Sequence, residues 1–512
     1  MTLLPAQPEI TPRAYDSTAR QVERLCALLP LVVVFLCSLA HPLDPDLGWH
    51  LKYGEYFFQH HALPPGNTFS AEMADYPYVN HAWGSDVILY ALFNAFGFPG
   101  ISFLGAAITT LTFACFSRAG HLSFWEEAIL FPPLLYVLNP ILEQSFRSQM
   151  ISLLGIGMLF LIAERAEKKS LSNLVMAVPL FVLWANGHGQ FVVGLALLAC
   201  WGGIYILRAW AAARWQRSGF PSRAFGIILA TGVGSGLASL LTPHGLTIYT
   251  EIGRHAVNQL QQHVNEWQPI GLEPRLWWPF LVCGAVLSVS CVHLYRQRQI
   301  MAKAHYLVPV LLLFAASIQQ RRHFWPMVLL SLPIIAPLAA RLRPQRPVAA
   351  TAIAVALLAG TYLYGGAVNL PRQHIFPYSW ELYCRHLGCT AQSATFLQSR
   401  LAGQTLLTDY DWGGWLIWNF PDIKPTIDGR MPFWRDEHGY SAYEHYLPLE
   451  NGEADIDASP YSMVYWPAKK ETLFNRLSQL VKENKWQEIY ADPFASIFVR
   501  NHRSPAIPAG SL

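Results

Sequence analysis

The sequence predicts an α-helical polytopic membrane protein of about eleven transmembrane helices, followed by a C-terminal extracytoplasmic α/β domain. Three observations predict this fold class. Hydrophobic residues make up 53% of the 512 residues and charged residues only 13%, whereas soluble domains carry about a quarter charged residues. Long apolar runs follow one another up to residue 366, and Lys and Arg are unevenly distributed between the loops that separate them. After residue 366 charged residues become frequent and the apolar runs shorten to the length of strands.

Eleven apolar runs approach the length of about 20 residues that a membrane-spanning helix needs. They lie at residues 25–43, 99–117, 124–142, 149–163, 171–185, 190–207, 224–242, 276–295, 304–319, 324–340 and 348–366. The first run follows several Arg residues, as a signal peptide would. It is longer than the apolar core of about 7–15 residues in signal peptides, so we expect it to remain in the protein as a transmembrane helix.

The Lys and Arg residues between these runs predict the orientation of the chain, because cytoplasmic loops of membrane proteins are enriched in them. With the N-terminus in the cytoplasm, seventeen of them fall inside and six outside before residue 367. The six outside are Lys52, Arg147, Arg254, Arg275, Arg321 and Arg322. We therefore expect a transmembrane domain over residues 1–366, with its long first loop (44–97) outside. The domain over residues 367–512 is expected on the same outer side.

Two carboxylates, Asp44 and Asp46, follow the first apolar run directly. Acidic side chains at a membrane boundary are costly to desolvate and commonly mark a site. Two carboxylates two residues apart can share a divalent cation, or act as a general base and its orienting partner. The structural alternative is that they cap a helix that begins near Leu47, since Asp is a good N-cap residue.

The rest of the first outer loop is rich in histidine and aromatic residues. His50 and His81 are candidates for positioning a substrate, whereas His60 and His61 fit better as anchors at the membrane interface. The segment 81–96 has an apolar face with polar interruptions, which predicts a helix that lies in the interface.

Other outer segments also carry charged candidates: Arg147, Glu266, and the adjacent Arg321 and Arg322. The adjacent arginines break the positive-inside pattern, so we expect an anion to face them. Lipid head groups and a bound phosphate or pyrophosphate are both compatible with such a pair.

The short apolar runs after residue 366 predict an α/β domain. The predicted strands lie at 404–408, 415–418, 462–465 and 496–500, and a helix is predicted over 470–484. Cys384 and Cys389 have four residues between them, and a disulfide between them is plausible outside the cytoplasm. The Pro-, Ala- and Ser-rich end of the chain predicts a disordered tail.

Two turns in this domain contain candidate ligand contacts. Asp411 and Trp412 lie in a Gly-rich turn, where an aromatic face can stack on a sugar or a peptide group. The alternative for this turn is a Gly-bent strand packed into the domain core. Asp428 and Arg430 form either a structural ion pair or a second ligand contact.

Several stretches of the sequence resemble bacterial polytopic glycosyltransferases of the GT-C fold class. DPDLGWHLKYGEYFFQHHALPPGNTFS (44–70) and NHAWGSDVILYALF (80–93) resemble their first outer loop. LWANGHGQFVVG (183–194), LTPHGLTIYTEI (241–252) and LLTDYDWGGWLIWNFPDIKPTIDGR (406–430) resemble segments of uncharacterised members. The class includes protein O-mannosyltransferases, aminoarabinose transferases and oligosaccharyltransferases. The resemblance covers most of the chain and implies a GT-C-like membrane domain.

The resemblance implies a glycosyltransferase of the bacterial inner membrane that moves a sugar from a polyprenyl-phosphate carrier to a glycan, lipid or protein acceptor outside. It places a general base, or a divalent cation such as Mg²⁺ or Mn²⁺, at Asp44 and Asp46. Arg147, Arg321 and Arg322 would neutralise the phosphate leaving group, where charge develops in the transition state. Membrane lipid is a further expected partner, and nucleic acid is not.

Two other classes of protein remain alternatives. A transporter or channel would also contain interrupted helices such as the break at Asn186–Gly189. Against it, the polar groups cluster on one membrane face, and the sequence shows no inverted repeat. A non-catalytic scaffold for envelope assembly would use the outer domain for binding alone.

Overall fold

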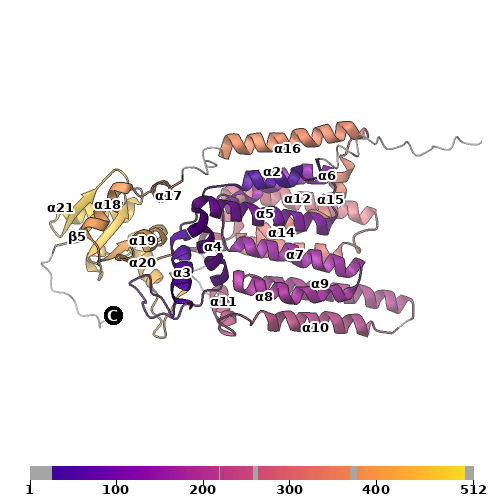
Figure 1. Ribbon diagram of the computed structural model, residues 1–512, viewed down its shortest axis with the longest axis horizontal. Coiled ribbons are helices and arrows are strands. Elements are labelled where there is room, and N and C mark those ends of the chain that lie inside the picture. Colours follow the sequence, from indigo (N-terminus) through magenta and orange to yellow (C-terminus); the bar gives the residue numbers. More distant parts are fainter. Residues whose placement is uncertain (1–25, 218, 258–262, 370–377, 502–512) are drawn as a thin grey trace, which may run out of the picture.

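The predicted apolar runs form a bundle of helices that extend along the long axis of the molecule (Figure 1). The computed structural model describes residues 26–217, 219–257, 263–369 and 378–501. The bundle helices are α2 (Leu29–Ser38), α5 (Phe98–Gly120), α6 (Phe124–Leu142), α7 (Gln149–Lys168), η1 (Leu171–Met176), α8 (Ala177–Gly187), α9 (Phe191–Trp215), α10 (Ser222–Ala238), α12 (Pro274–Arg296), α13 (Ala304–Gln319), α14 (Phe324–Leu330), α15 (Leu332–Arg341) and α16 (Pro347–Asn369). The C-terminal domain lies beyond one end of this bundle, which we call the domain end; the other is the far end.

Only some of these helices have the length and composition of a membrane span. Among the described residues, α5, α7, α9, α12 and α16 pass that test, and Arg321–Leu330 with Leu332–Arg341 forms a sixth candidate bent by 51°. Four apolar helical segments are shorter: α2, η1 with α8, α10 and α13. Each of the eleven predicted runs contains a helix, so the helical membrane fold is confirmed, while eleven as the number of spans stays a prediction.

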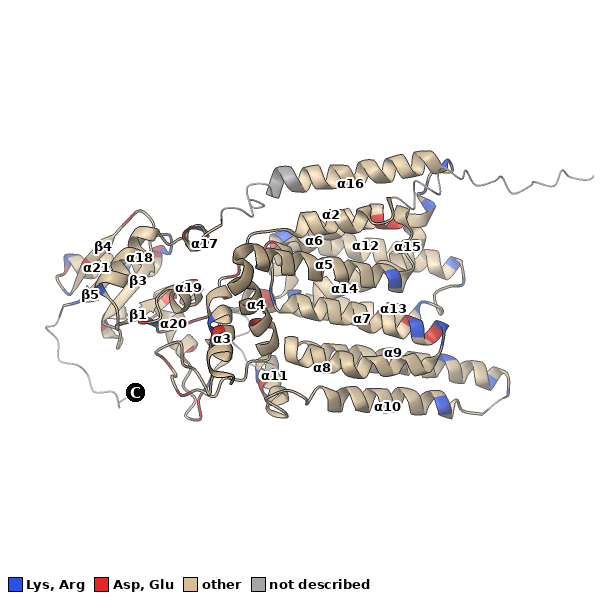
Figure 2. Cartoon of the chain, viewed as in Figure 1, with Lys and Arg blue, Asp and Glu red and all other residues tan. Residues whose placement is uncertain are grey.

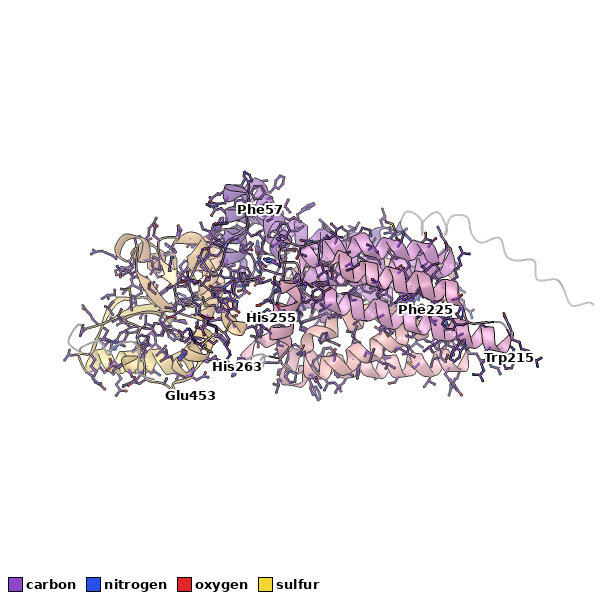
Figure 3. The ribbon with its side chains drawn as sticks, turned by 90° about the horizontal axis from the view of Figure 1, so that it is seen from below. Phe57, Trp215, Phe225, His255, His263 and Glu453 are labelled. Carbon is purple, nitrogen blue, oxygen red and sulfur yellow. A yellow bond between two sulfur atoms is a disulfide. The ribbon has the colours of Figure 1, made fainter. Side chains whose placement is uncertain are left out.

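The basic residues of the bundle gather mainly at the far end, as Figure 2 shows. The far end includes Trp215 at the end of α9 and Phe225 in the first turns of α10, both labelled in Figure 3. The loops that the sequence assigns to one side of the membrane therefore lie together in space.

Three helices lie at the domain end, between the bundle and the C-terminal domain: α3 (Leu47–His60), α4 (Trp83–Phe96) and α11 (Thr247–Val257). Helix α4 corresponds to the predicted interfacial segment 81–96, and α3 and α4 both run across the direction of the bundle helices (Figure 1). Helix α3 packs against α4 on one side and against α19 (Gly413–Asn419) of the C-terminal domain on the other.

The C-terminal domain contains a five-stranded mixed sheet of order β2-β1-β3-β5-β4. The strands are β1 (Thr405–Thr408), β2 (Lys424–Pro425), β3 (Met463–Pro467), β4 (Trp486–Ala491) and β5 (Ala495–Arg500). Strand β1 is parallel to β2 and β3, whereas β5 is antiparallel to β3 and β4. The helices are α17 (Trp380–Leu387), α18 (Ala391–Arg400), α19, α20 (Ala442–Asn451) and α21 (Glu471–Lys482).

Most of the predicted elements of this domain are confirmed, and one is wrong. Strands β1, β3 and β5 and helix α21 match the predicted runs. The run predicted as a strand at 415–418 instead lies in α19. Trp415, Leu416 and Ile417 are all buried, so the run has no polar face from which a helical or strand period could be recognised.

The predicted first outer loop is packed into the C-terminal domain. Tyr76 belongs to the same buried cluster as Trp434, and their rings stack with centroids 4.6 Å apart. Cys384 and Cys389 form the disulfide that their spacing suggested. The predicted tail lies outside the described residues.

Candidate active site

A cavity of about 860 Å³ lies at the domain end and is lined by residues of both the bundle and the C-terminal domain. Its apolar part is formed by α6, α12 and α16, for example by Leu135, Leu276 and Tyr364. Its charged lining residues are Asp46, Glu143, Arg147, Glu266, Glu273, Arg275, Arg321, Asp411, Glu450 and Lys470. His263, labelled in Figure 3, lines the cavity at the junction of the two parts. One cavity therefore combines an apolar groove and a charged chamber.

Arg147, which lines this chamber, lies among three carboxylates. Its guanidinium nitrogens are 3.6 Å from Asp44 (Nε to Oδ2), 3.5 Å from Asp46 (Nη2 to Oδ2) and 3.6 Å from Glu266 (Nη1 to Oε2). The short connection between α6 and α7 carries Arg147, the start of α3 carries the aspartates, and η3 (Asn265–Trp267) carries Glu266. The structure thus brings together four of the residues singled out in the sequence.

The two aspartates are not equivalent. Asp46 lines the cavity, and its side chain is 18% exposed; the indole Nε1 of Trp49 donates to its Oδ1 at 2.9 Å. The side chain of Asp44 is only 3% exposed, and its Oδ1 accepts the backbone N–H of Asp46 at 3.1 Å. Helix α3 begins at Leu47. Its N-cap residue, Asp46, makes no side-chain capping hydrogen bond, and Asp44 accepts the N–H of Asp46 rather than one from the first turn, so the capping alternative is not confirmed for either carboxylate.

Burial and the neighbouring Asp44 raise the pKa of Asp46 to about 6, more than Arg147 lowers it. The pKa of Glu266 shifts in the opposite direction. Burial alone would raise it, but the charges of Arg147 and Arg322 outweigh burial and lower it. Asp46 can therefore exchange a proton near neutral pH, whereas Glu266 stays ionised.

His50 lies behind the aspartates. Its Nδ1 is 2.6 Å from Oδ1 of Asp86, whose Oδ2 accepts from Asn80 at 2.7 Å. Burial opposes protonation of His50, but the Asp86 carboxylate outweighs it and raises the pKa of His50. The imidazole also stacks on Trp49, with ring centroids 3.6 Å apart. His50 therefore supports the start of α3, and it is absent from the described lining of the large cavity.

His81 lies in a cluster of histidines instead. Its ring centroid is 5.7 Å from those of His188 and His255. Burial and the neighbouring His255 lower the pKa of His81 to about 3, so it is neutral at physiological pH. The described cavity lining does not include it.

The adjacent arginines have different environments. Arg321 lines the cavity, and it donates to Glu273 (Nη1 to Oε2, 2.8 Å) and to Gln268 (Nη2 to Oε1, 2.5 Å). Arg322 instead stacks on Trp267, with its guanidinium carbon 4.1 Å from the ring centroid. Only Arg321 of the two lines the described part of the cavity.

The C-terminal domain contributes Tyr410, Asp411, Tyr443, Glu450 and Lys470 to the cavity wall. The Nζ of Lys470 lies 2.6 Å from Oδ2 of Asp409 and also pairs with Glu450. Burial and Asp409 raise the pKa of Asp411 to about 6.

Trp412 requires a correction. Its side chain is 0% exposed, and its Nε1 donates to the carbonyl of Leu387 at 3.0 Å. It packs on Tyr465, with ring centroids 4.5 Å apart. Trp412 is thus a core residue and does not face a substrate, but it lies in the 3-10 helix η6 (Tyr410–Trp412) and not in the Gly-bent strand of the alternative.

Several lining residues were not singled out in the sequence, chiefly Arg275, Tyr443, Glu450 and Lys470. Arg275 is the residue for which a signal existed, because it is a basic residue at the outer start of a predicted membrane helix. The other three lie on α20 and beside α21, and only the packing of the C-terminal domain on the bundle brings them to the cavity.

Another group of three residues, of types that commonly bind metal ions, lies at the far end. Side-chain ligand atoms of Glu164, Glu167 and His305 lie within 4.8 Å of one another. Each carboxylate is already matched to a cation, since Lys168 lies 3.1 Å from Glu164 and Arg208 lies 2.9 Å from Glu167. This group is remote from the cavity, since it lies at the opposite ends of α7 and α13 from Arg147 and Arg321.

The fold of the helical bundle and the C-terminal α/β domain is similar to that of solved GT-C-like membrane glycosyltransferases. The oligosaccharyltransferase of Archaeoglobus fulgidus in the apo form matches with a TM-score of 0.50 and 11% identity, covering 89% of this chain and 70% of that one. The same protein tethered to an acceptor peptide containing the NVT sequon gives the same values. ArnT from Cupriavidus metallidurans, bound to undecaprenyl phosphate, matches with a TM-score of 0.48 and 13% identity, over 96% of this chain and all of that one. No family model and no curated protein sequence matches the chain.

Proposed function

We propose that the chain transfers a sugar from a polyprenyl-phosphate-type lipid carrier to an extracytoplasmic glycan, lipid or protein acceptor, with Asp46 as general base. The observation that carries this proposal is the continuity of one cavity from an apolar groove to Asp46 and Arg321. A carrier of this kind has an apolar tail, an anionic head and a polar sugar. Its binding site needs those three environments in that order.

The carrier would lie with its tail along α6, α12 and α16 and its phosphate beside Arg275 and Arg321, which both line the cavity. Guanidinium groups bind phosphate through charge-assisted hydrogen bonds. In the transfer step, the bond between the anomeric carbon and the phosphate oxygen breaks, and negative charge develops on the departing phosphate. Cations fixed in advance at this position stabilise the transition state more than the ground state.

The acceptor would approach from the wall formed by Tyr410, Asp411 and Tyr443. Its hydroxyl or amine attacks the anomeric carbon while Asp46 takes the proton. A pKa of about 6 leaves this carboxylate mostly ionised at pH 7 and more basic than an ordinary aspartate, as a general base requires. Asp44 does not line the cavity, so we assign it the role of holding Arg147 and the start of α3.

A divalent cation at Asp44 and Asp46 fits this arrangement poorly. The guanidinium of Arg147 already lies among these two carboxylates and Glu266, 3.5–3.6 Å from each. Mg²⁺ demands close, nearly octahedral oxygen coordination at about 2.1 Å, and Arg147 would have to leave first. We therefore assign the positive charge of the site to Arg147 and route no step through a metal.

We propose that the reaction takes place on the outer side of the bacterial inner membrane. The loops with most Lys and Arg residues lie at the far end, which the positive-inside rule assigns to the cytoplasm. The disulfide between Cys384 and Cys389 supports the same orientation, because disulfides persist in oxidising compartments.

The test is to offer tritiated polyprenyl-phosphate hexoses, pentoses and amino sugars to the purified protein in detergent and in liposomes. Release of polyprenyl phosphate, with the label in an acceptor or as free sugar, is the expected result. Movement of intact labelled sugar across the liposome would indicate the transporter alternative. Neither cleavage nor movement with any donor would favour the scaffold.

A further inference from the structure

A turn of the C-terminal domain touches the carboxylate of Asp46 directly. Gly429 lies so close that a Cβ atom built on it would be 1.6 Å from Oδ1 of Asp46 and 2.6 Å from its carboxyl carbon. Tyr410 holds this turn by donating its hydroxyl to the carbonyl of Gly429 at 3.3 Å. Any side chain at position 429 would therefore have to displace the Asp46 carboxylate or the turn itself.

The next residue, Arg430, is buried and held rigidly. Its Nε donates to Oδ1 of Asp428 at 2.8 Å and its Nη2 to Oδ2 at 2.7 Å. Nη2 also reaches Asn67 at 2.8 Å and Ser70 at 3.1 Å in the first outer loop. A guanidinium buried in this way is stable only because its charge and its donors are matched.

Four aromatic rings surround the same guanidinium. Its central carbon lies 5.0–5.9 Å from the ring centroids of Phe69, Trp434, Tyr78 and Trp49, within the range of cation–π attraction. Trp49 is the member of this cage that donates to Oδ1 of Asp46. The cage therefore fixes the ring that holds Asp46.

We propose that Gly429 and Arg430 are positioning residues that hold the Asp46 carboxylate in one orientation. Gly429 acts by direct contact, and Arg430 acts through Trp49. Both act on Oδ1, which leaves Oδ2, the oxygen facing Arg147, available to a substrate in the cavity. This inference rests on the proposed role of Asp46 as the base.

The physical reason for such a device is the sensitivity of proton transfer to geometry. A displacement of about 1 Å in a reacting group can cost on the order of 100-fold in rate, so a base needs a locked rotamer and a fixed neighbour. Asp46 and Trp49 lie at the start of α3, outside the C-terminal domain, but Gly429 and Arg430, which contact Asp46 and Trp49 respectively, belong to that domain. The domain is accordingly part of the active site.

The first test measures the protonation of Asp46 without any substrate. A water-soluble carbodiimide modifies protonated carboxyls, and mass spectrometry of the full-length protein gives the labelling midpoint of Asp46 as a function of pH. Trp49→Phe keeps the ring in the cage and removes the N–H that stabilises the carboxylate. The midpoint should rise by about 0.5–1 pH unit, which corresponds to the loss of one hydrogen bond. An unchanged midpoint would overturn the proposal.

The second test uses turnover of the tritiated carrier that the protein accepts. Gly429→Ala should lower kcat at least tenfold with little change in KM for the carrier. Gly271→Ala is the matched control, because a Cβ there meets nothing within 4 Å, and it should leave turnover and thermal midpoint unchanged. Wild-type kcat for Gly429→Ala in a folded protein would contradict the inference.

Asp46→Asn separates this inference from the proposed function. If Asp46→Asn turns over normally, the proposed function of Asp46 fails, whatever the other variants show. If Asp46→Asn is inactive while Trp49→Phe and Gly429→Ala match the wild type in kcat and labelling midpoint, only the positioning inference fails.

Discussion

The guanidinium of Arg147 lies 3.5 Å from the carboxylate of Asp46, measured from Nη2 to Oδ2. The two residues are 101 positions apart in the sequence, one at the start of α3 and the other between α6 and α7. Their pairing places a permanent positive charge beside Asp46, which lines the described cavity, whereas Asp44 does not. The predictions below follow from this pair and from the groove that leads to it.

The pH dependence of turnover should report Asp46. The carboxylate must be ionised to accept a proton, so kcat/KM should rise with pH through about 6, the pKa of Asp46, and then level off. Below that value the rate should fall about tenfold per pH unit. A steady-state profile with the preferred carrier checks this expectation, and a rate independent of pH between 5 and 7 would exclude Asp46 as the base.

Arg147→Ala should move the rising part of this pH profile to higher pH. The charge of Arg147 lowers the pKa of Asp46, so its removal leaves more of the carboxylate protonated at neutral pH and should reduce turnover at pH 6 on the order of tenfold. Arg147→Lys keeps the charge and serves as the matched control, with a smaller shift. Identical pH profiles for the wild type and Arg147→Ala would refute the assigned role.

The same variant tests the assignment of the site charge. Arg147→Ala leaves Asp44, Asp46 and Glu266 without their cation, and three convergent carboxylates suit a divalent ion. Electron paramagnetic resonance should therefore detect one bound Mn²⁺ in Arg147→Ala and none at this site in the wild type. Stoichiometric Mn²⁺ in the wild type that Asp46→Asn abolishes would show that a metal does belong there.

Blocking the apolar groove should weaken carrier binding selectively. Thr361 of α16 lines the cavity, and Thr361→Trp fills the space that we assign to the lipid tail. KM for the carrier should rise about tenfold, equivalent to about 1.4 kcal/mol, with kcat nearly constant. The control is Leu363→Trp, because Leu363 is 67% exposed on another face of the same helix. Equal kinetics for the two variants would place the tail elsewhere.

The disulfide should stabilise the C-terminal domain modestly. Cys384 and Cys389 are only five positions apart, and closing so short a loop in the unfolded chain is worth about 2 kcal/mol in the chain-entropy model. Cys384→Ser with Cys389→Ser should lower the thermal midpoint of the intact protein, and dithiothreitol should do the same to the wild type only. A variant as stable as the oxidised wild type would contradict this expectation.

The fold could be predicted because apolar length and the sorting of Lys and Arg are strong signals in a membrane protein. The α/β domain followed from short apolar runs between polar segments. The prediction at 415–418 failed because Trp415, Leu416 and Ile417 are all buried, so the run shows neither a helical nor a strand period. The change in composition after residue 366 was visible in the sequence, although α16 itself extends to Asn369.

The candidate site could be predicted only in part. The acidic pair, Arg147, Glu266 and Arg321 were recognisable as charges out of place at a membrane boundary. Only one of the two aspartates and one of the two adjacent arginines line the cavity. The difference depends on side-chain directions at the start of α3 and in η5 (Arg321–His323), and the periodicity of the sequence does not encode these directions. The positioning role of Gly429 depends on contact between segments almost 400 residues apart.

The most direct measurement compares Asp46→Asn with Asp44→Asn in turnover of the tritiated carrier. General-base catalysis contributes about 10²–10⁴-fold. Asp46→Asn should therefore lose at least 100-fold in kcat while retaining carrier binding and its thermal midpoint, and Asp44→Asn should lose distinctly less. Normal turnover by Asp46→Asn, or a larger loss from Asp44→Asn, would contradict the assignment of Asp46 as the base.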